Sequence, residues 1–325
     1  MLLAGDLGGT KTDLALIDPA KGPREPVAAA SFSTSQFPSL EAMVQQFLAA
    51  HPARLRAACF GVAGPVVAGT ATITNLGWVL REEALAAALR LRQVRLINDL
   101  EAIATALPHL TADDSEPLAA GQPEKGGTVA VIAPGTGLGE AFLIWNGERY
   151  IAHPSEGGHC DFAPTNDLQA ALLAWLGRDG AHVSYEDVCS GRGIPNLYAF
   201  LRARGAPEPP WLHARLAAAA DPTPIILNAA LQEDPPQICL DTLNLFVDIL
   251  AAEAGNLALK VLATGGLYFA GGLSLRLLSV LTAERVLPGF RSKGRLAALL
   301  ERIPVSIITN PKVGLLGAAY AALER

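Results

Sequence analysis

The chain has 325 residues, of which 50% are hydrophobic and 17% are charged, and its formal net charge is -6. This length and apolar content suit two globular domains, each with a core of its own. The negative balance, with no run of lysine or arginine longer than a pair, argues against a surface built for nucleic acid or anionic membrane.

Three further absences bear on where the protein works. No basic stretch followed by an apolar run precedes the first predicted strand at Leu2, so no export signal is expected. No apolar run reaches the ~20 residues that a membrane span needs. The four cysteines form no CxxC pair, which favours reduced thiols over a zinc site. We therefore expect a cytoplasmic protein that binds small molecules, with neither nucleic acid nor membrane as a partner.

Strand and helix signals alternate through the first hundred residues, as is typical of an α/β unit. Ser39 is a predicted N-cap, because its hydroxyl can accept a backbone N–H that otherwise has no partner. The predicted strands cover residues 2–7, 14–17, 27–32, 56–62 and 94–97, and the predicted helices cover residues 39–50, 81–91 and 100–107.

The rest of the chain is richer in helix, and its prolines at 207–210 and 222–224 are expected to break helices rather than link domains. The predicted strands cover 128–133, 141–145, 267–270 and 303–308, and the helices 167–176, 194–203, 211–219, 237–262 and 314–323. The last helix is expected to return to the first lobe. We predict a small α/β domain of residues 1–108, completed by a C-terminal helix within 309–325, and a large α/β domain of residues 109–308.

A glycine turn between two apolar strands occurs twice, as GDLGGTKT at Gly5 and as APGTGLG at Ala133. Glycines allow positive φ and a close approach of backbone N–H groups to phosphate oxygens. Asp6 is placed to hold Mg²⁺ through water, and Lys11 to supply a positive charge. A single such turn could be a plain β-hairpin, and neither a P-loop nor a dinucleotide fingerprint is present. Because the turn is repeated, we predict an ATP-dependent phosphotransferase.

Three other segments are candidates for chemistry. Asn98 and Asp99 follow a strand at its carboxyl end, where Asp99 could act as a general base, although either residue could merely cap the next helix. The polar segment Glu156–His159 suits a polyhydroxylated substrate, but an exposed turn is the alternative. Gly271 and Gly272 could let a nucleoside lie against bare backbone, or could serve tight strand–helix packing.

Together these motifs resemble the bacterial glucokinases of the hexokinase group, in the actin-like ATPase superfamily. The resemblance covers the full chain, and INDLEA with EGGHCDFAP at this separation is its most specific part. Its motifs are GDLGGTKT at Gly5, GPV at Gly64, TNLGW at Thr74, INDLEA at Ile97, APGTGLGEA at Ala133, EGGHCDFAP at Glu156, SGRGIPNLY at Ser190, GGLYFAGG at Gly265 and GLLGAA at Gly314.

The resemblance implies a two-lobed actin-like ATPase (ribonuclease H-like) fold with the active site in the interlobe cleft, and a homodimer. It implies that Asp99 takes the proton from the 6-hydroxyl of D-glucose. The residues implied to bind the sugar are Asn75, Asn98, Asp99, Glu156, His159 and Glu186. Those implied to bind ATP and Mg²⁺ are Asp6, through water to the metal, Gly8, Gly9, Thr10, Lys11, Gly135, Thr136, Gly137, Gly271 and Gly272.

Two alternatives remain open from the sequence. One is a kinase for another hexose or an amino sugar, although an acetamide group needs space that Glu156 and His159 would deny. The other is a silent sugar sensor, which would not need the base Asp99.

Overall fold

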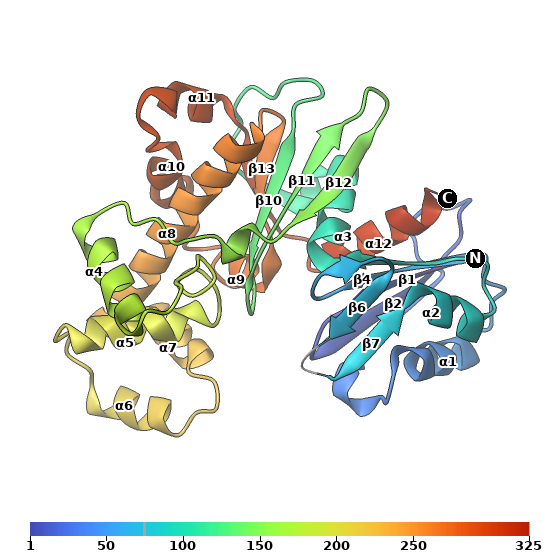
Figure 1. Ribbon diagram of the computed structural model, residues 1–325, viewed down its shortest axis with the longest axis horizontal. Helices are drawn as coiled ribbons and strands as arrows, with labels where there is room; N and C mark the ends of the chain where they lie inside the picture. Colours follow the sequence, from blue (N-terminus) through green and yellow to red (C-terminus); the bar gives the residue numbers. More distant parts are fainter. Residues whose placement is uncertain (74–75, 325) are drawn as a thin grey trace. The chain divides into compact units, whose positions relative to one another are not determined.

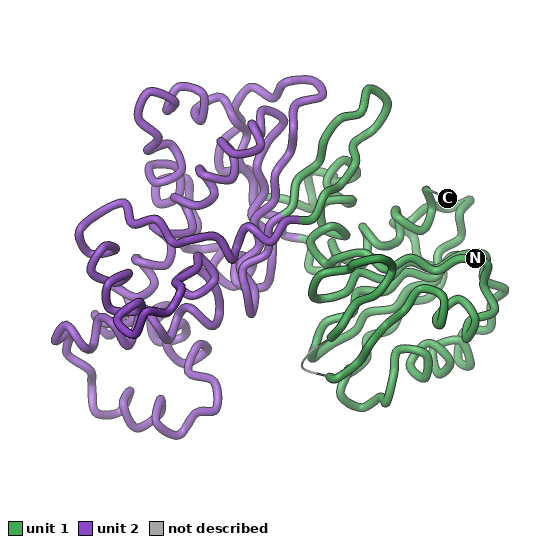
Figure 2. The backbone as a smooth tube through the Cα atoms, viewed as in Figure 1, with its two compact units in different colours: residues 1–115, 141–154, 310–325 green, residues 116–140, 155–309 purple. Residues whose placement is uncertain are grey.

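The computed structural model describes residues 1–73 and 76–324, which form two compact units (Figure 2). Unit 1 comprises residues 1–115, 141–154 and 310–325, and unit 2 comprises residues 116–140 and 155–309. Residues 141–154 thus count with unit 1, whereas the division drawn from the sequence placed them in the large domain.

Unit 1 is built on a five-stranded mixed sheet. Its strands lie in the order β3 (Ala28–Ser33), β2 (Lys11–Ile17), β1 (Leu2–Leu7), β4 (Ala57–Val62) and β8 (Val94–Asn98). The hairpin β1–β2 and the pair β2–β3 are antiparallel, whereas β1, β4 and β8 run parallel. A small antiparallel sheet of β5 (Val66–Val67), β6 (Thr70–Ile73) and β7 (Trp78–Arg81) was not predicted.

The alternation of β1 divides its side chains between two cores. Leu3 and Leu7 join the core that includes α1 (Leu40–Ala50) and α2 (Glu82–Leu89). Leu2 and Ala4 join the core that includes α3 (Asp99–Ala106) and α12 (Val313–Leu323). Because strand side chains alternate, Asp6 belongs to the face that α12 covers. The last helix returns to the first sheet, since α12 packs on β1, β4 and α3.

Unit 2 has a parallel sheet core. Strands β10 (Val129–Pro134), β13 (Gly266–Phe269) and β14 (Val305–Ile308) lie side by side in that order, and β9 (Ser115–Ala119) follows β14. Strand β11 (Leu138–Trp145) begins beside β10 and is followed along the chain by β12 (Tyr150–Ser155). The sequence predicted β10, β11, β13 and β14 to within a few residues, but not β9 or β12.

The long helix α8 (Gln237–Val261) runs through the middle of unit 2 and is buried over most of its length (Figure 1). It packs on α5, α7 and α10 in one large apolar core. The other helices of the unit are α4 (Asp167–Leu176), α5 (Gly193–Ala203), α6 (Pro210–Ala217), α7 (Thr223–Ala230), α9 (Gly271–Arg276), α10 (Ala283–Arg291) and α11 (Ala297–Arg302).

The prolines at 222–224 separate α6 from α7, as predicted, and they also begin a helix that was not predicted. Pro224 lies in the first turn of α7, where a missing N–H costs no intrahelical hydrogen bond. Ser39 caps α1 as expected, accepting the N–H of Ala42 at 3.3 Å. Within the described residues, no helix combines the length and apolar character needed to cross a bilayer.

Candidate active site

The first glycine turn joins β1 to β2, and Thr34 donates hydrogen bonds to two of its carbonyl groups. The N–H of Gly8 donates to the carbonyl of Lys11 at 3.0 Å. The Thr34 hydroxyl donates to the carbonyl of Gly8 at 2.9 Å, and the Thr34 N–H donates to the carbonyl of Thr10 at 2.9 Å. Sequence reasoning missed Thr34, because a single threonine after a strand carries no signal of this contact.

Position 8 requires glycine because a side chain has no room there, and not because of the backbone angle φ. Gly8 does not adopt a positive φ, which corrects the expectation that the turn would use one. A Cβ on Gly8 would lie 2.9 Å from the carbonyl oxygen of Lys11, closer than real Cβ atoms come. The close return of the chain therefore excludes a side chain at this position.

Asp6 lies at the end of β1 in acidic surroundings. Burial, followed by the charges of Asp99 and Asp13, raises the pKa of Asp6 to about 7, while Lys11 opposes the shift. The ammonium of Lys11 forms an ion pair with Asp13 at 2.9 Å. Gly314 at the start of α12 packs against the Asp6 carboxylate, because a Cβ there would lie 2.6 Å from Oδ2. Within unit 1, Asp6 thus lies close enough to Lys11 and Asp99 for their charges to act on it.

The surroundings of Asp6 fit a magnesium ion held largely by water and phosphate. Within the described residues no cluster of three or more histidine, cysteine or acidic side chains could hold a metal by itself. Mg²⁺ is commonly bound through one or two carboxylates, with water and substrate phosphates as its other ligands. A divalent cation near Asp6 would also offset the repulsion among Asp6, Asp13 and Asp99.

Asn98, not Asp99, caps helix α3. Its side-chain oxygen accepts the N–H groups of Leu100 at 2.8 Å and Glu101 at 3.3 Å, and its amide donates to the carbonyl of Gly64 at 3.0 Å. Asp99 is the first residue of α3, and its Oδ1 accepts the N–H of Leu100 at 2.9 Å. The N-cap role is therefore filled by Asn98, although Asp99 also accepts an N–H in the first turn of α3. The predicted sugar-pocket residue Asn75 lies outside the described residues.

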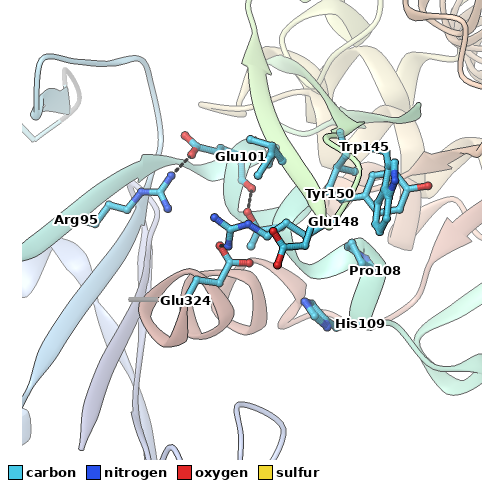
Figure 3. Close-up of a pocket in the computed structure, with 13 residues that line it drawn as sticks. Arg95, Glu101, Pro108, His109, Trp145, Glu148, Tyr150 and Glu324 are labelled. Atoms are coloured by element: carbon cyan, nitrogen blue, oxygen red, sulfur yellow. Dashed lines mark hydrogen bonds and ion pairs between the residues drawn. The ribbon is translucent and has the colours of Figure 1, made fainter. Parts of the chain in front are cut away.

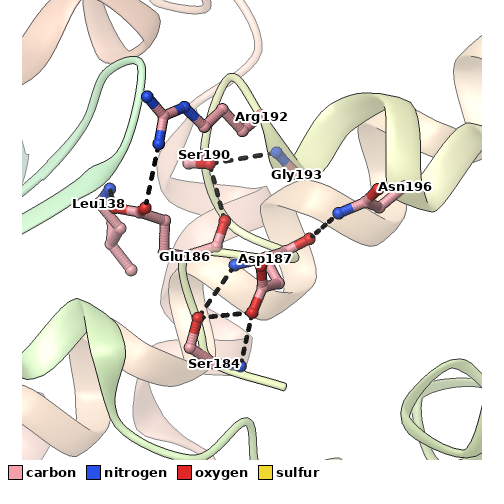
Figure 4. A network of polar contacts seen from close by, with 8 residues as sticks. All are labelled: Leu138, Ser184, Glu186, Asp187, Ser190, Arg192, Gly193 and Asn196. Carbon is pink, nitrogen blue, oxygen red and sulfur yellow. Dashed lines mark hydrogen bonds and ion pairs between the residues drawn. The ribbon is translucent and has the colours of Figure 1, made fainter. Parts of the chain in front are cut away.

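The second glycine turn, between β10 and β11, is tied to the segment after α4 (Figure 4). The N–H of Gly135 donates to the carbonyl of Gly137 at 2.8 Å, much as the N–H of Gly8 closes the first turn. The carboxylate of Glu186 accepts the N–H of Leu138 at 2.9 Å and packs so closely on Gly137 that a Cβ there would overlap it. The guanidinium of Arg192 lies 3.9 Å from the same carboxylate.

The segment Glu156–His159 contacts Glu186 as well. Gly157–His159 forms a single 3₁₀ turn, on which Glu156 and His159 are exposed while Gly158 is buried. The N–H of Glu186 donates to the carbonyl of Gly158 at 2.8 Å. The structure thus brings Glu186, which sequence patterns alone did not single out, against both glycine-rich turns of unit 2.

A cavity of about 450 Å³ lies beside the second glycine turn, within unit 2. Gly135, Thr136 and Gly272 line it, so three of the nucleotide residues predicted in this unit border one cavity. Gly271 has φ 84°, and a Cβ there would lie 2.7 Å from the carbonyl of Pro134. Further lining residues, none of which was a predicted site residue, are Gly191, Arg192, Pro195, Asp221, Thr223, Pro224, Leu273 and Arg276.

Unit 1 holds a separate cavity of about 260 Å³, shown in Figure 3. Two ion pairs line it, one between Arg95 and Glu101 at 2.7 Å and one between Arg149 and Glu324 at 2.9 Å. None of its lining residues is a predicted site residue. A cavity alone therefore does not mark the candidate site, whereas in each unit a glycine turn with acidic side chains beside it does.

Comparison with known proteins gives one consistent result. A family model described as Glucokinase matches residues 3–325. A glucokinase of Trichormus variabilis is 44% identical, covering 99% of this chain and 98% of that protein. The crystal structure of a glucokinase from an Antarctic psychrotroph has a TM-score of 0.80 at 33% identity, covering 100% of this chain and 99% of that one. A ROK family glucokinase from Streptomyces griseus, solved with glucose and AMPPNP, shares the fold, with a TM-score of 0.63 at 23% identity over 100% and 99% of the two chains.

Proposed function

The chain belongs to the glucokinase family and is an ATP-dependent hexose kinase, and from this premise we propose which of its residues carry the reaction. It transfers the terminal phosphoryl group of ATP to the 6-hydroxyl of D-glucose, giving glucose 6-phosphate and ADP. It has the two-lobed actin-like ATPase fold of the family. The fold class and the activity expected from the sequence are thereby confirmed.

Asp99 is the proposed general base. Its carboxylate stands at the carboxyl end of a strand, where ligands of α/β sheets gather, and the capping role beside it is filled by Asn98. A base here accepts the proton of the 6-hydroxyl as that oxygen attacks the terminal phosphorus atom. Within the described residues the Asn98 amide makes one hydrogen bond, to the carbonyl of Gly64, and its second hydrogen is proposed to bind a neighbouring sugar hydroxyl.

Glu156, His159 and Glu186 are proposed to bind the other hydroxyls of glucose. The observation that carries this proposal is the position of Glu186, which contacts Gly137 in the phosphate-type turn and Gly158 in the Glu156–His159 turn. A residue that joins both turns belongs where sugar and phosphate chain meet. The exposed side chains of Glu156 and His159 are open to a ligand.

The two glycine turns are proposed to bind the phosphate chain, with the cavity beside Gly135, Thr136 and Gly272 taking the nucleoside. Backbone N–H groups of Gly8, Gly9 and Thr10 would donate to phosphate oxygens, and Lys11 would add positive charge. Asp6 would hold Mg²⁺ through water. When bound, the metal neutralises charge that develops on the phosphate oxygens during transfer.

We also propose that the protein is cytoplasmic, where ATP is available, and that it acts as a homodimer. The assembly can be checked by light scattering on the purified protein over a range of concentrations. A constant monomer mass would contradict the homodimer.

The deciding experiment is an assay of sugar phosphate formation with ATP and Mg²⁺ against glucose, mannose, fructose and N-acetylglucosamine. Preference for glucose, with a raised glucose KM in His159→Ala and Glu156→Gln, is the expected outcome. Transfer to another sugar would keep the chemistry but refute the assigned pocket. Glucose binding without transfer would point to a sugar sensor.

A further inference from the structure

A buried acidic pair lies beneath the turn that carries Glu156 and His159. Glu140, on β11, is 1% exposed, and Glu253, on α8, is 0% exposed. The Glu140 carboxyl packs directly under Gly157, because a Cβ on Gly157 would overlap its Oε2. The other oxygen of Glu140, Oε1, is buried without a hydrogen-bond partner in the described part of the chain.

The two carboxyl groups differ in their partners. Glu253 is paired on both oxygens, at 2.9 Å from the ammonium of Lys260 and at 2.8 Å from the amide of Asn256. Glu140 has neither of these two contacts, and a second ionised carboxylate buried beside Glu253 is costly. Burial first, and then the charge of Glu253, raise the pKa of Glu140 to about 7, with Lys260 opposing. Proton binding is therefore favoured at Glu140, which lacks the ammonium contact that Glu253 has.

Other charged and titratable groups face this pair from neighbouring elements. Lys293, after α10, donates to Asn256 at 2.7 Å, and the Asn256 amide also donates to the hydroxyl of Tyr185 at 2.9 Å. Burial, and after it the charge of Glu253, raise the pKa of the Cys189 thiol. Tyr185 donates its N–H to the carbonyl of Cys160, the residue after the turn, at 3.0 Å.

We propose that Glu140 is a positioning residue for the sugar: its buried carboxyl packs against Gly157 and so fixes the position of the turn that presents Glu156 and His159. This inference rests on the proposed role of those two residues in binding glucose. Loss of the carboxyl leaves a void under the turn, and ionisation places a second negative charge beside Glu253. Either change displaces the sugar ligands while the nucleotide cavity is untouched.

The test compares Glu140→Ala and Glu140→Gln with the wild-type protein and with the control Glu208→Gln. Glu208 is a largely buried acid of the same unit whose carboxylate accepts from Tyr198 and His213, away from the turn. Glu140→Ala should raise the glucose KM about tenfold or more, because a small displacement of the groups that bind the sugar weakens binding strongly. The ATP KM should change by no more than about twofold. Glu140→Gln, which keeps a neutral side chain of the same shape, should restore the wild-type glucose KM near pH 6.

The pH dependence of the glucose KM distinguishes a role of Glu140 in positioning the turn from a role in stability alone. As pH rises through about 7, wild-type Glu140 ionises, so the wild-type glucose KM should climb relative to that of Glu140→Gln. His159 is present in both proteins, so only the difference between the two profiles counts. Parallel profiles would overturn the proposal, as would an unchanged glucose KM in Glu140→Ala. If Glu140→Ala does not fold, the Glu140→Gln profile decides alone.

A failure of the underlying function gives a different pattern. If glucose is not bound by the turn, His159→Ala leaves the glucose KM unchanged. If His159→Ala raises it but neither Glu140 variant departs from wild type, the sugar site stands and the role of Glu140 is refuted.

Discussion

Gly314 and Asp6 lie against each other although 307 residues separate them along the chain. A Cβ on Gly314 would be 2.6 Å from Oδ2 of Asp6 and 3.0 Å from its Cγ. The start of α12 thereby fixes the carboxylate that we propose to hold Mg²⁺ through water. The closing helix thus completes the core of unit 1 and also shapes the candidate site.

Gly314→Ala is expected to lower kcat about tenfold or more, because the new methyl group displaces the Asp6 carboxylate. Alanine is otherwise favoured over glycine in a helix by up to ~1 kcal/mol, so the stability loss should be small. Steady-state kinetics and thermal unfolding, measured on the same preparation, check both parts. Full activity in this variant would show that the position of Asp6 does not matter.

Asp99→Asn should reduce kcat by roughly 10² to 10⁴ while glucose still binds, because the amide cannot accept the proton of the 6-hydroxyl. Glu101→Gln is the matched control on the same helix, since Glu101 pairs with Arg95 at 2.7 Å. Turnover and equilibrium glucose binding are the measurements. If Asp99→Asn turns over like the wild type, Asp99 is not the base.

Arg192→Ala should raise the ATP KM by about threefold to tenfold with little change in the glucose KM. Arg192 lines the cavity of unit 2 beside Gly135 and Thr136 and lies 3.9 Å from Glu186. Its guanidinium is suited to contact phosphate. Arg204→Ala, which removes a cation stacked on Phe200 at the end of α5, serves as the control. Equal effects of the two substitutions would argue against a local role.

Asp114 should stabilise unit 1 in a pH-dependent way. Burial opposes its ionisation, but hydrogen bonds from Arg24, Thr111 and Asn310 outweigh burial and lower the pKa of Asp114. A lowered folded-state pKa means that the stabilisation is complete above the ordinary aspartate pKa and is lost as pH falls through the folded value.

Asp114→Asn should therefore lower the free energy of unfolding by about 2 kcal/mol near pH 7, and by progressively less below about pH 4. Urea unfolding at several pH values measures the difference. Asp113→Asn, at the exposed neighbouring position, is the control. A difference that stays constant down to about pH 2 would contradict the linkage to Asp114 ionisation.

Much of the fold was predictable, because its elements carry local signals. The apolar runs and the glycine turn at 2–17 predicted the hairpin β1–β2, and Ser39 predicted the start of α1. The strands β5 and β6 were missed because two to four residues are too few to show a period. Helix α9 begins at Gly271, within a glycine pair that the sequence alone does not distinguish from a turn.

The sequence by itself determined the family, the activity class and the segments that carry candidate site residues, since these depend on residue identity and spacing. Only the tertiary structure decided that Asn98 caps α3, that Thr34 holds the Gly8 turn, and that Glu186 joins two turns. It also decided that Glu140 lies beside Glu253 and under Gly157. Packing and pKa values depend on neighbours brought from distant parts of the chain, which no local pattern of residues records.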